Sequence, residues 1–144
     1  MYKIPVSVLV VIHTADLQVL LLERADHPGY WQSVTGSQDF GETLEQTAIR
    51  EVLEETGLNA SQYALTNWGV SNTYEIYPEW RWRYDPGVTH NTEHVFGLAL
   101  PAPLDVTLAP REHLQFIWMP AQAAIDKVFS PSNAAALKKL LDMA

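Results

Sequence analysis

The chain of 144 residues contains no cysteine and only nine lysine and arginine residues. The lack of cysteine excludes disulfide bonds, zinc–thiolate sites and a cysteine nucleophile. Because acidic residues number 17, the formal net charge is −8, which argues against a nucleic-acid backbone or an anionic membrane as the main partner. A polyanionic ligand would therefore need a bridging cation, such as a divalent metal ion held by carboxylates.

The sequence also lacks an apolar run long enough to span a bilayer. The mostly apolar run over residues 6–12 is rich in β-branched residues and has no small-residue cleavage site, so we expect a strand there and not a signal segment. The hydrophobic content of 47% is typical of a folded protein. We expect one domain over residues 1–144, without repeats or linkers, and a cytoplasmic location.

The sequence predicts alternating strands and helices along the chain. Apolar and β-branched segments predict strands over residues 3–13, 19–24, 31–35, 63–77, 94–100 and 115–119. Loops are expected over residues 36–42 and 78–93, and the second is long and aromatic, which is typical of functional loops. Closing helices are predicted over residues 120–128 and 130–143, the second with Ser130 as its cap.

A further helix, after residue 42, has clear local signals at both ends. Thr43 followed by Gln46 forms a capping-box pattern, and Leu44, Ala48 and Val52 share one face. Gly57 stands where a C-terminal glycine would end the helix.

Three glutamates lie close together in the last turns of this helix. Glu51, Glu54 and Glu55 fall at i, i+3 and i+4, where like charges repel and where the helix dipole disfavours anions. No lysine or arginine lies three or four residues later to compensate. An acidic solvated face is one explanation. A magnesium site is the other, because Mg²⁺ prefers hard oxygen ligands and locally unfavourable clusters mark functional sites.

The helix belongs to a longer pattern over residues 36–58. Its fixed positions are Gly36, Glu42, Arg50, Glu51, Glu54, Glu55 and Gly57, and its apolar positions are Val52 and Leu58. This pattern resembles the signature of the Nudix hydrolase family. The resemblance implies an α/β fold, the Nudix α/β/α sandwich with a mixed central sheet. It also implies hydrolysis of a phosphoanhydride with Mg²⁺, or with Mn²⁺ as the alternative ion.

The resemblance assigns roles position by position. Glu51, Glu54 and Glu55 would bind metal, Gly36 would lend backbone to the site, Arg50 would orient a glutamate, and Glu42 would pair with Arg50. Outside the pattern, Glu112 is the candidate for an additional metal-binding or catalytic acid. An exposed loop glutamate is the plainer explanation of Glu112 from the sequence alone. The general base is Glu51 or an outside glutamate, and the family pattern leaves that choice open.

Segments outside the pattern resemble one bacterial group within this family. The group releases pyrophosphate from 7,8-dihydroneopterin triphosphate, leaving the monophosphate, in folate biosynthesis. The segments that carry the resemblance are residues 5–7, 31–37, 83–84, 86–89, 91–93 and 112–114. They imply a small-molecule triphosphate as the partner, with neither nucleic acid nor membrane; the oligomeric state is not predicted.

Substrate contacts are expected from three sets of side chains. A flat slot and an acceptor for an amino-pyrimidine edge would come from Tyr74, Glu75, Ile76 and Tyr77, phosphate binding from Lys3 and Arg24, and hydroxyl donors from Thr35 and Ser130. Packing, solubility and capping are the plainer explanations for these residues. The five histidines show no metal-ligand spacing and are expected in surface or packing roles.

Two other functions remain open. A broader (d)NTP diphosphatase, acting for example on dATP, would use the same carboxylates and aromatic residues. A non-catalytic Nudix-fold binding module would normally show a degraded pattern, whereas every catalytic position is filled here.

Overall fold

The apolar run near the N-terminus forms strand β1 (Val6–His13), around which the sheet is arranged in the computed structural model, which describes residues 2–144. One edge of β1 pairs in parallel with β6 (His90–Ala99) along the whole strand. Its other edge is shared: β4 (Val34–Ser37) pairs with the first part of β1, and β2 (Gln18–Arg24) pairs with its end, at His13. The sheet therefore forks along this edge of β1.

The remaining strands extend both sides of the fork. Strand β5 (Ala64–Glu75) pairs antiparallel with β6, while β3 (Trp31–Gln32) and β7 (His113–Pro120) pair antiparallel with β2. The seven strands follow the order β3-β2-β1-β6-β5, with β4 attached to β1 and β7 to β2. One parallel pair among antiparallel pairs makes the sheet mixed, as expected from the sequence.

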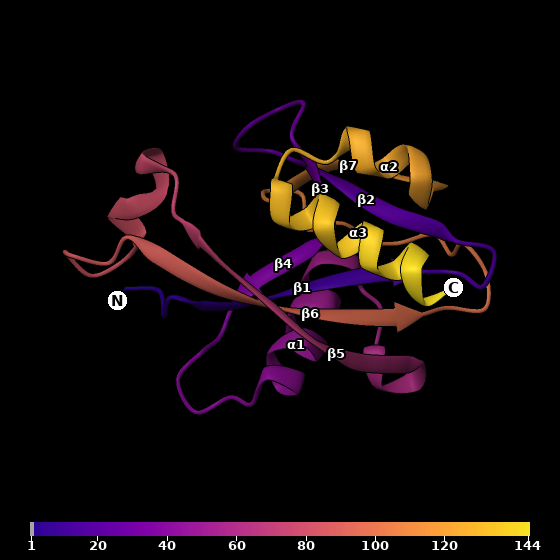
Figure 1. Ribbon diagram of the computed structural model, residues 1–144, viewed down its shortest axis with the longest axis horizontal. Coiled ribbons are helices and arrows are strands. Elements are labelled where there is room, and N and C mark those ends of the chain that lie inside the picture. The colour runs from indigo at the N-terminus through magenta and orange to yellow at the C-terminus, as the bar shows by residue number, and fades with distance from the viewer. Residues whose placement is uncertain (1) are drawn as a thin grey trace.

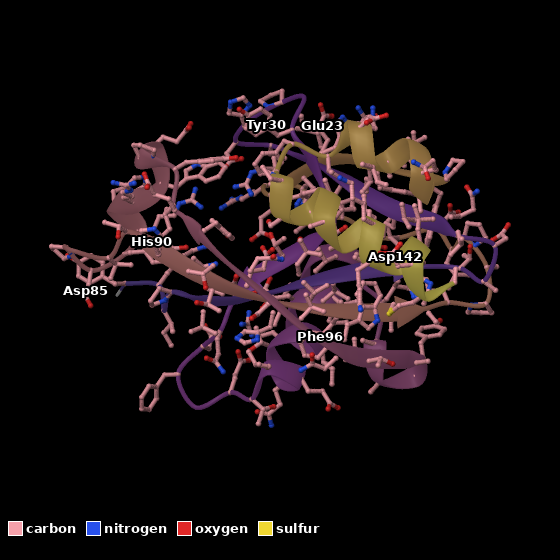
Figure 2. The ribbon with its side chains drawn as sticks, in the orientation of Figure 1. Glu23, Tyr30, Asp85, His90, Phe96 and Asp142 are labelled. Atoms are coloured by element: carbon pink, nitrogen blue, oxygen red, sulfur yellow. The ribbon has the colours of Figure 1, made fainter. Side chains whose placement is uncertain are left out.

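Helices cover both faces of this sheet (Figure 1). Because successive strand residues point to opposite faces, Val8 and Val10 of β1 pack with Val52 of α1 (Leu44–Thr56), whereas Leu9 packs with Leu137 of α3 (Pro131–Met143). The short helix α2 (Ala121–Lys127) joins the α3 side. Phe96, labelled in Figure 2, is buried in the core on the α1 side. The predicted α/β/α sandwich is confirmed.

Helix α1 begins and ends where its local signals predict. The Thr43 side chain accepts a hydrogen bond from the Gln46 backbone N–H, and the Gln46 side chain accepts one from the Thr43 N–H, so the capping box is complete. Gly57 ends the helix with a φ of 76°, in the left-handed region that favours glycine.

Several predicted boundaries differ from the structure because strand ends are set by pairing partners. Residues 3–5 precede β1, and the strand expected over residues 31–35 is divided into β3 and β4 at Ser33. Gly36 and Ser37, expected in a loop, pair with β1 as the end of β4. The loop expected over residues 78–93 contains a 3-10 helix, η2 (Pro78–Arg83). Strand β6 begins at His90, before the predicted end of this loop.

Two further features of the fold are a projecting segment and a contact between distant parts of the chain. The β5–η2–β6 segment projects beyond the body of the molecule, with Asp85 and His90 at its left end in Figure 2. At the start of α3, the Asn133 side chain accepts from the Ser33 N–H at 2.8 Å and donates to the Ser33 hydroxyl at 3.0 Å, across 100 residues of sequence. The segment η1 (Ala60–Gln62) completes the fold, and no helix within residues 2–144 is long and apolar enough to cross a membrane.

Candidate active site

A cavity of about 1150 Å³ lies where the N-terminal segment, α1, the β5–η2–β6 segment and the start of α3 meet. It collects almost all residues that the sequence marks as candidates for metal or substrate binding: Lys3, Arg24, Thr35, Gly36, Arg50, Glu51, Glu54, Glu55, Tyr74, Glu75, Ile76, Tyr77, Glu112 and Ser130. Glu42 is the exception, since it pairs with Arg50 without lining the cavity. The fold thus brings candidates from distant parts of the sequence to one place.

The three glutamates of α1 differ in environment. Glu51 and Glu55 are 9% and 2% exposed, whereas the Glu54 side chain is 51% exposed. The Glu51 carboxylate lies directly against Gly36, because a Cβ atom at Gly36 would overlap its Cδ atom. Any larger residue at Gly36 would displace this carboxylate.

Arg50 holds the carboxylates of this region together. Its guanidinium donates to both oxygens of Glu42 at 2.7 and 3.0 Å, to Glu51 at 2.7 Å, and to the Ser37 carbonyl at 2.9 Å. It also lies 3.4 Å from Glu54, four residues later on the helix. The hydrogen bonds from Arg50 hold the pKa of Glu42 at about 2. The expectation that no basic residue compensates these glutamates was therefore wrong for Glu51 and Glu54, because it considered only residues after them.

Glu51 and Glu55 form a buried acidic pair. Burial raises the pKa of both carboxyls, and the neighbouring Glu51 raises the pKa of Glu55 further. The Oε1 atom of Glu55 has no hydrogen-bond partner, and its near neighbour is the His113 Nε2 at 3.6 Å. Burial and the charge of Arg24 lower the pKa of His113 to about 4, so this histidine is neutral at pH 7. The pair therefore lacks a compensating positive charge on the Glu55 side.

The donor chemistry of this pair fits a hard divalent cation. Carboxylate oxygens are the ligands that Mg²⁺ prefers, and a cation would stabilise the ionised form of the buried Glu55. Within residues 2–144 no group of three or more histidine or acidic side chains is already gathered closely enough to hold a metal ion. Glu54 and Glu112 line the same cavity and are exposed, so both are available to a cation bound at the pair.

Basic side chains gather on another part of the cavity wall. Arg24 donates to Gln32 at 3.1 Å and pairs with Asp26 at 2.7 Å, and Arg83 of η2 approaches the same aspartate at 3.4 Å. The Lys3 backbone N–H donates to the Arg83 carbonyl at 2.8 Å, and loss of water together with the charge of Arg83 lowers the pKa of the Lys3 side chain. Arg83 was not predicted as a site residue. Its segment was predicted to be a long aromatic loop, and residues 83–84 were noted for their resemblance, but no role was assigned to Arg83 because the local sequence does not show which basic residue turns inward.

Aromatic rings line the cavity beside these cations. Tyr77 and Trp80 have ring centroids 5.2 Å apart, and Phe129 meets Trp80 edge to face at 6.2 Å. The Arg24 guanidinium lies 4.5 Å from the centre of the Trp80 ring. Tyr77 was predicted for a flat slot, whereas Trp80 and Phe129 were not assigned to the site. The wall presents apolar rings beside the cationic group.

The remaining candidates have identifiable local partners. The Ser130 hydroxyl caps α3 by accepting from the Asn133 N–H, and Thr35 accepts from the Gln32 side chain at 3.3 Å. Ile76 is buried, and its backbone N–H donates to Thr89. The Glu75 carboxylate is 66% exposed and pairs with Arg81 at 2.7 Å, so it already has a cationic partner at the rim.

The fold and the carboxylate helix together define a protein class. The NUDIX domain family model matches residues 3–140, and the chain belongs to the Nudix family.

Two relatives are similar over nearly the whole chain. A dihydroneopterin triphosphate diphosphatase from Escherichia coli (strain K12) is 45% identical over 143 residues, which cover 97% of this chain and 94% of that protein. A protein of the same name from Haemophilus influenzae is 43% identical and covers 97% of this chain and 89% of its own. The structure of the E. coli dihydroneopterin triphosphate pyrophosphohydrolase matches with a TM-score of 0.93 at 44% identity, covering 100% of this chain and 99% of that one.

Proposed function

We propose that this protein hydrolyses 7,8-dihydroneopterin triphosphate to the monophosphate and pyrophosphate in folate biosynthesis, with Mg²⁺ or Mn²⁺ as the metal. One observation carries the proposal: a single cavity holds a buried carboxylate pair on α1, a group of cations, and an aromatic wall. These are the three environments that the metal, the phosphates and the ring of such a substrate need. The names of the similar E. coli and H. influenzae proteins support the same substrate.

Glu51 and Glu55, with Glu54 and Glu112, would hold the metal. When bound, a divalent cation neutralises phosphate charge and lowers the pKa of water for attack at phosphorus. Arg50 fixes the Glu51 carboxylate through its 2.7 Å hydrogen bond, and Glu42 anchors Arg50 from the other side.

The remaining charged residues would bind and orient the substrate. Lys3, Arg24 and Arg83 would neutralise the triphosphate, which a chain of net charge −8 could not otherwise attract. The hydroxyls of Thr35 and Ser130 would donate to phosphate oxygens. Ring stacking on the aromatic wall would place the pterin beside Arg24, one of the cations that would bind the phosphates.

A general base would be supplied by one of two glutamates. Glu51 lies buried beside Arg50, while Glu112 stands exposed in the turn before β7, close enough to affect the pKa of Glu55. Either carboxylate could take a proton from attacking water.

A substrate panel tests the proposal. Pyrophosphate and phosphate release would be measured with Mg²⁺ for 7,8-dihydroneopterin triphosphate, dATP, the other dNTPs and a dinucleoside polyphosphate. We expect the highest kcat/KM for the pterin compound. A large preference for dATP would instead support a broader (d)NTP diphosphatase, which the aromatic wall also suits because any base can stack on it. Binding without turnover of any substrate would favour a non-catalytic module.

A further inference from the structure

Two hydrogen-bond acceptors are buried near the start of β6 without partners. Asn91 and Glu93 are 2% and 3% exposed, and both line the cavity. The Asn91 Oδ1 and Glu93 Oε1 atoms accept no hydrogen bond within the described part of the chain. Because the two residues are separated by one, their side chains share a face of the strand, the face on which Val95 packs with α3.

The surroundings of Glu93 contain no compensating cation. It pairs with Ser7 of β1 in the parallel register, and the hydroxyl of Ser132 in α3 lowers the pKa of its carboxyl group only in part. The Asn91 amide donates to Ser7 and Tyr74, which holds the neighbouring side chains in place. No lysine, arginine or histidine in residues 2–144 forms an ion pair with Glu93. Burial consequently raises the pKa of Glu93 to about 7.

Packing alone does not account for a glutamate in this position. A buried carboxylate oxygen without a donor destabilises the folded protein, and an apolar residue or glutamine would avoid most of that cost. Locally unfavourable choices of this kind are expected where a ligand supplies the missing partners.

We propose that Glu93 determines substrate specificity by accepting hydrogen bonds from the 2-amino-4-oxopyrimidine part of the pterin ring. This inference rests on the proposed function. Such a ring presents a ring N–H beside an exocyclic amino group, so two donors face the two oxygens of one carboxylate. Adenine presents an amino donor beside an acceptor nitrogen, which would meet a carboxylate oxygen without a proton between them. In its ionised form, the buried carboxyl group therefore selects against adenine as well as for the pterin.

Glu75 provides the competing assignment, because it also lines the cavity near the aromatic residues. Its carboxylate, however, is mostly exposed and paired with Arg81. Water and Arg81 already satisfy it, so a ring donor would gain less there than at Glu93.

Substitution of each glutamate by glutamine separates the two assignments. For E93Q we expect kcat/KM for 7,8-dihydroneopterin triphosphate to fall about 10- to 100-fold, the range for loss of a hydrogen bond to a charged group, with dATP turnover unchanged or increased. E75Q should change the ratio of the two substrates less than twofold. The control is E79Q, the same chemical change at an exposed glutamate of η2 that does not line the cavity.

A binding measurement without metal keeps the test independent of turnover. Neopterin and adenosine would be titrated by calorimetry in the presence of EDTA. We expect neopterin binding to weaken at least tenfold in E93Q and to be retained in E79Q. A larger loss in E75Q than in E93Q, or an unchanged substrate ratio and neopterin affinity in E93Q, would overturn the inference.

The proposed function is tested separately, by the substrate preference of the wild-type protein. A wild-type preference for dATP would refute the pterin substrate, whichever residue binds neopterin. Should E93Q fail to fold by circular dichroism, E93D takes its place because it keeps the carboxylate. Retained selectivity for neopterin over adenosine in E93D would support the inference, and equal binding of both would count against it.

Discussion

Glu55 shows how a single residue can be unfavourable for the fold and suited to the proposed chemistry. Its carboxyl is 2% exposed, and burial together with Glu51 raises its pKa well above the usual value. A bound divalent cation would reverse that effect by favouring the ionised form. Burial of Glu55 thus destabilises the fold when metal is absent, and the same burial would strengthen metal binding.

Replacing the buried pair one residue at a time tests this relation. We expect E51Q and E55Q each to lower kcat by about 100-fold or more, as for loss of a group that acts directly in the reaction. E55Q should not lower the thermal midpoint, because the neutral amide removes a buried ionisable group. Steady-state kinetics and thermal unfolding would measure both effects, with E45Q, an exposed glutamate of the same helix, as control. Near-wild-type turnover in both variants would refute the metal-binding assignment.

Glu93 predicts a pH dependence of stability that can be measured without substrate. Its pKa is about 7 in the folded protein, compared with the ordinary glutamate value of 4.5 that applies in the unfolded chain. The folded protein therefore binds more protons between these values, and stability falls as pH rises through that window. E93Q removes this loss: at pH 8 we expect it to be more stable than wild type by at most about 3 kcal/mol, with a much smaller difference at pH 5. Urea unfolding at both pH values would show it, and equal differences would contradict the prediction.

At the scale of elements, helix α1 was predictable because its signals are local. Thr43, Gln46 and Gly57 specify its ends, and the glutamate spacing places the carboxylates on neighbouring positions. The β5–η2–β6 segment was not predictable in the same way. The start of β6 depends on pairing with β5 and β1. Residues 83–84 and 91–93 were noted only for their resemblance, and no local pattern showed that Arg83 and Glu93 would reach the cavity.

The N-terminal cap of α1 gives an element-scale prediction. T43A removes the acceptor for the Gln46 N–H and should cost about 1 kcal/mol. For a domain of this size the thermal midpoint should fall by roughly 2–4 °C. T43S, which keeps the hydroxyl, should stay close to wild type. Because the cap is at the opposite end of α1 from Glu54 and Glu55, kcat should change little in T43A. An unchanged midpoint would show that the cap contributes nothing measurable.

For the whole molecule, the net charge of −8 makes cations general stabilisers, whereas a specific metal site requires the cavity. Mg²⁺ at about 100 times its dissociation constant should stabilise the fold by about 2.7 kcal/mol and raise the thermal midpoint by roughly 5–10 °C. E55Q should lose most of this response, while E45Q retains it. EDTA should abolish turnover without changing the far-ultraviolet circular dichroism spectrum. An equal Mg²⁺ response in E55Q would point to diffuse counter-ion binding.

The hydrogen bonds between Ser33 and Asn133 have a consequence for how the protein becomes functional. They join residues 100 positions apart, a separation similar to that of β2 and β7, whose pairing in the sheet already closes a loop of this length. The cavity wall is complete only after that closure, since Ser130 and Glu93 meet there across α3 and β6. A refolding chain in which the sheet and α1 have formed but α3 has not docked would therefore be inactive. Recovery of catalysis would then report the docking of α3 and not the formation of the sheet.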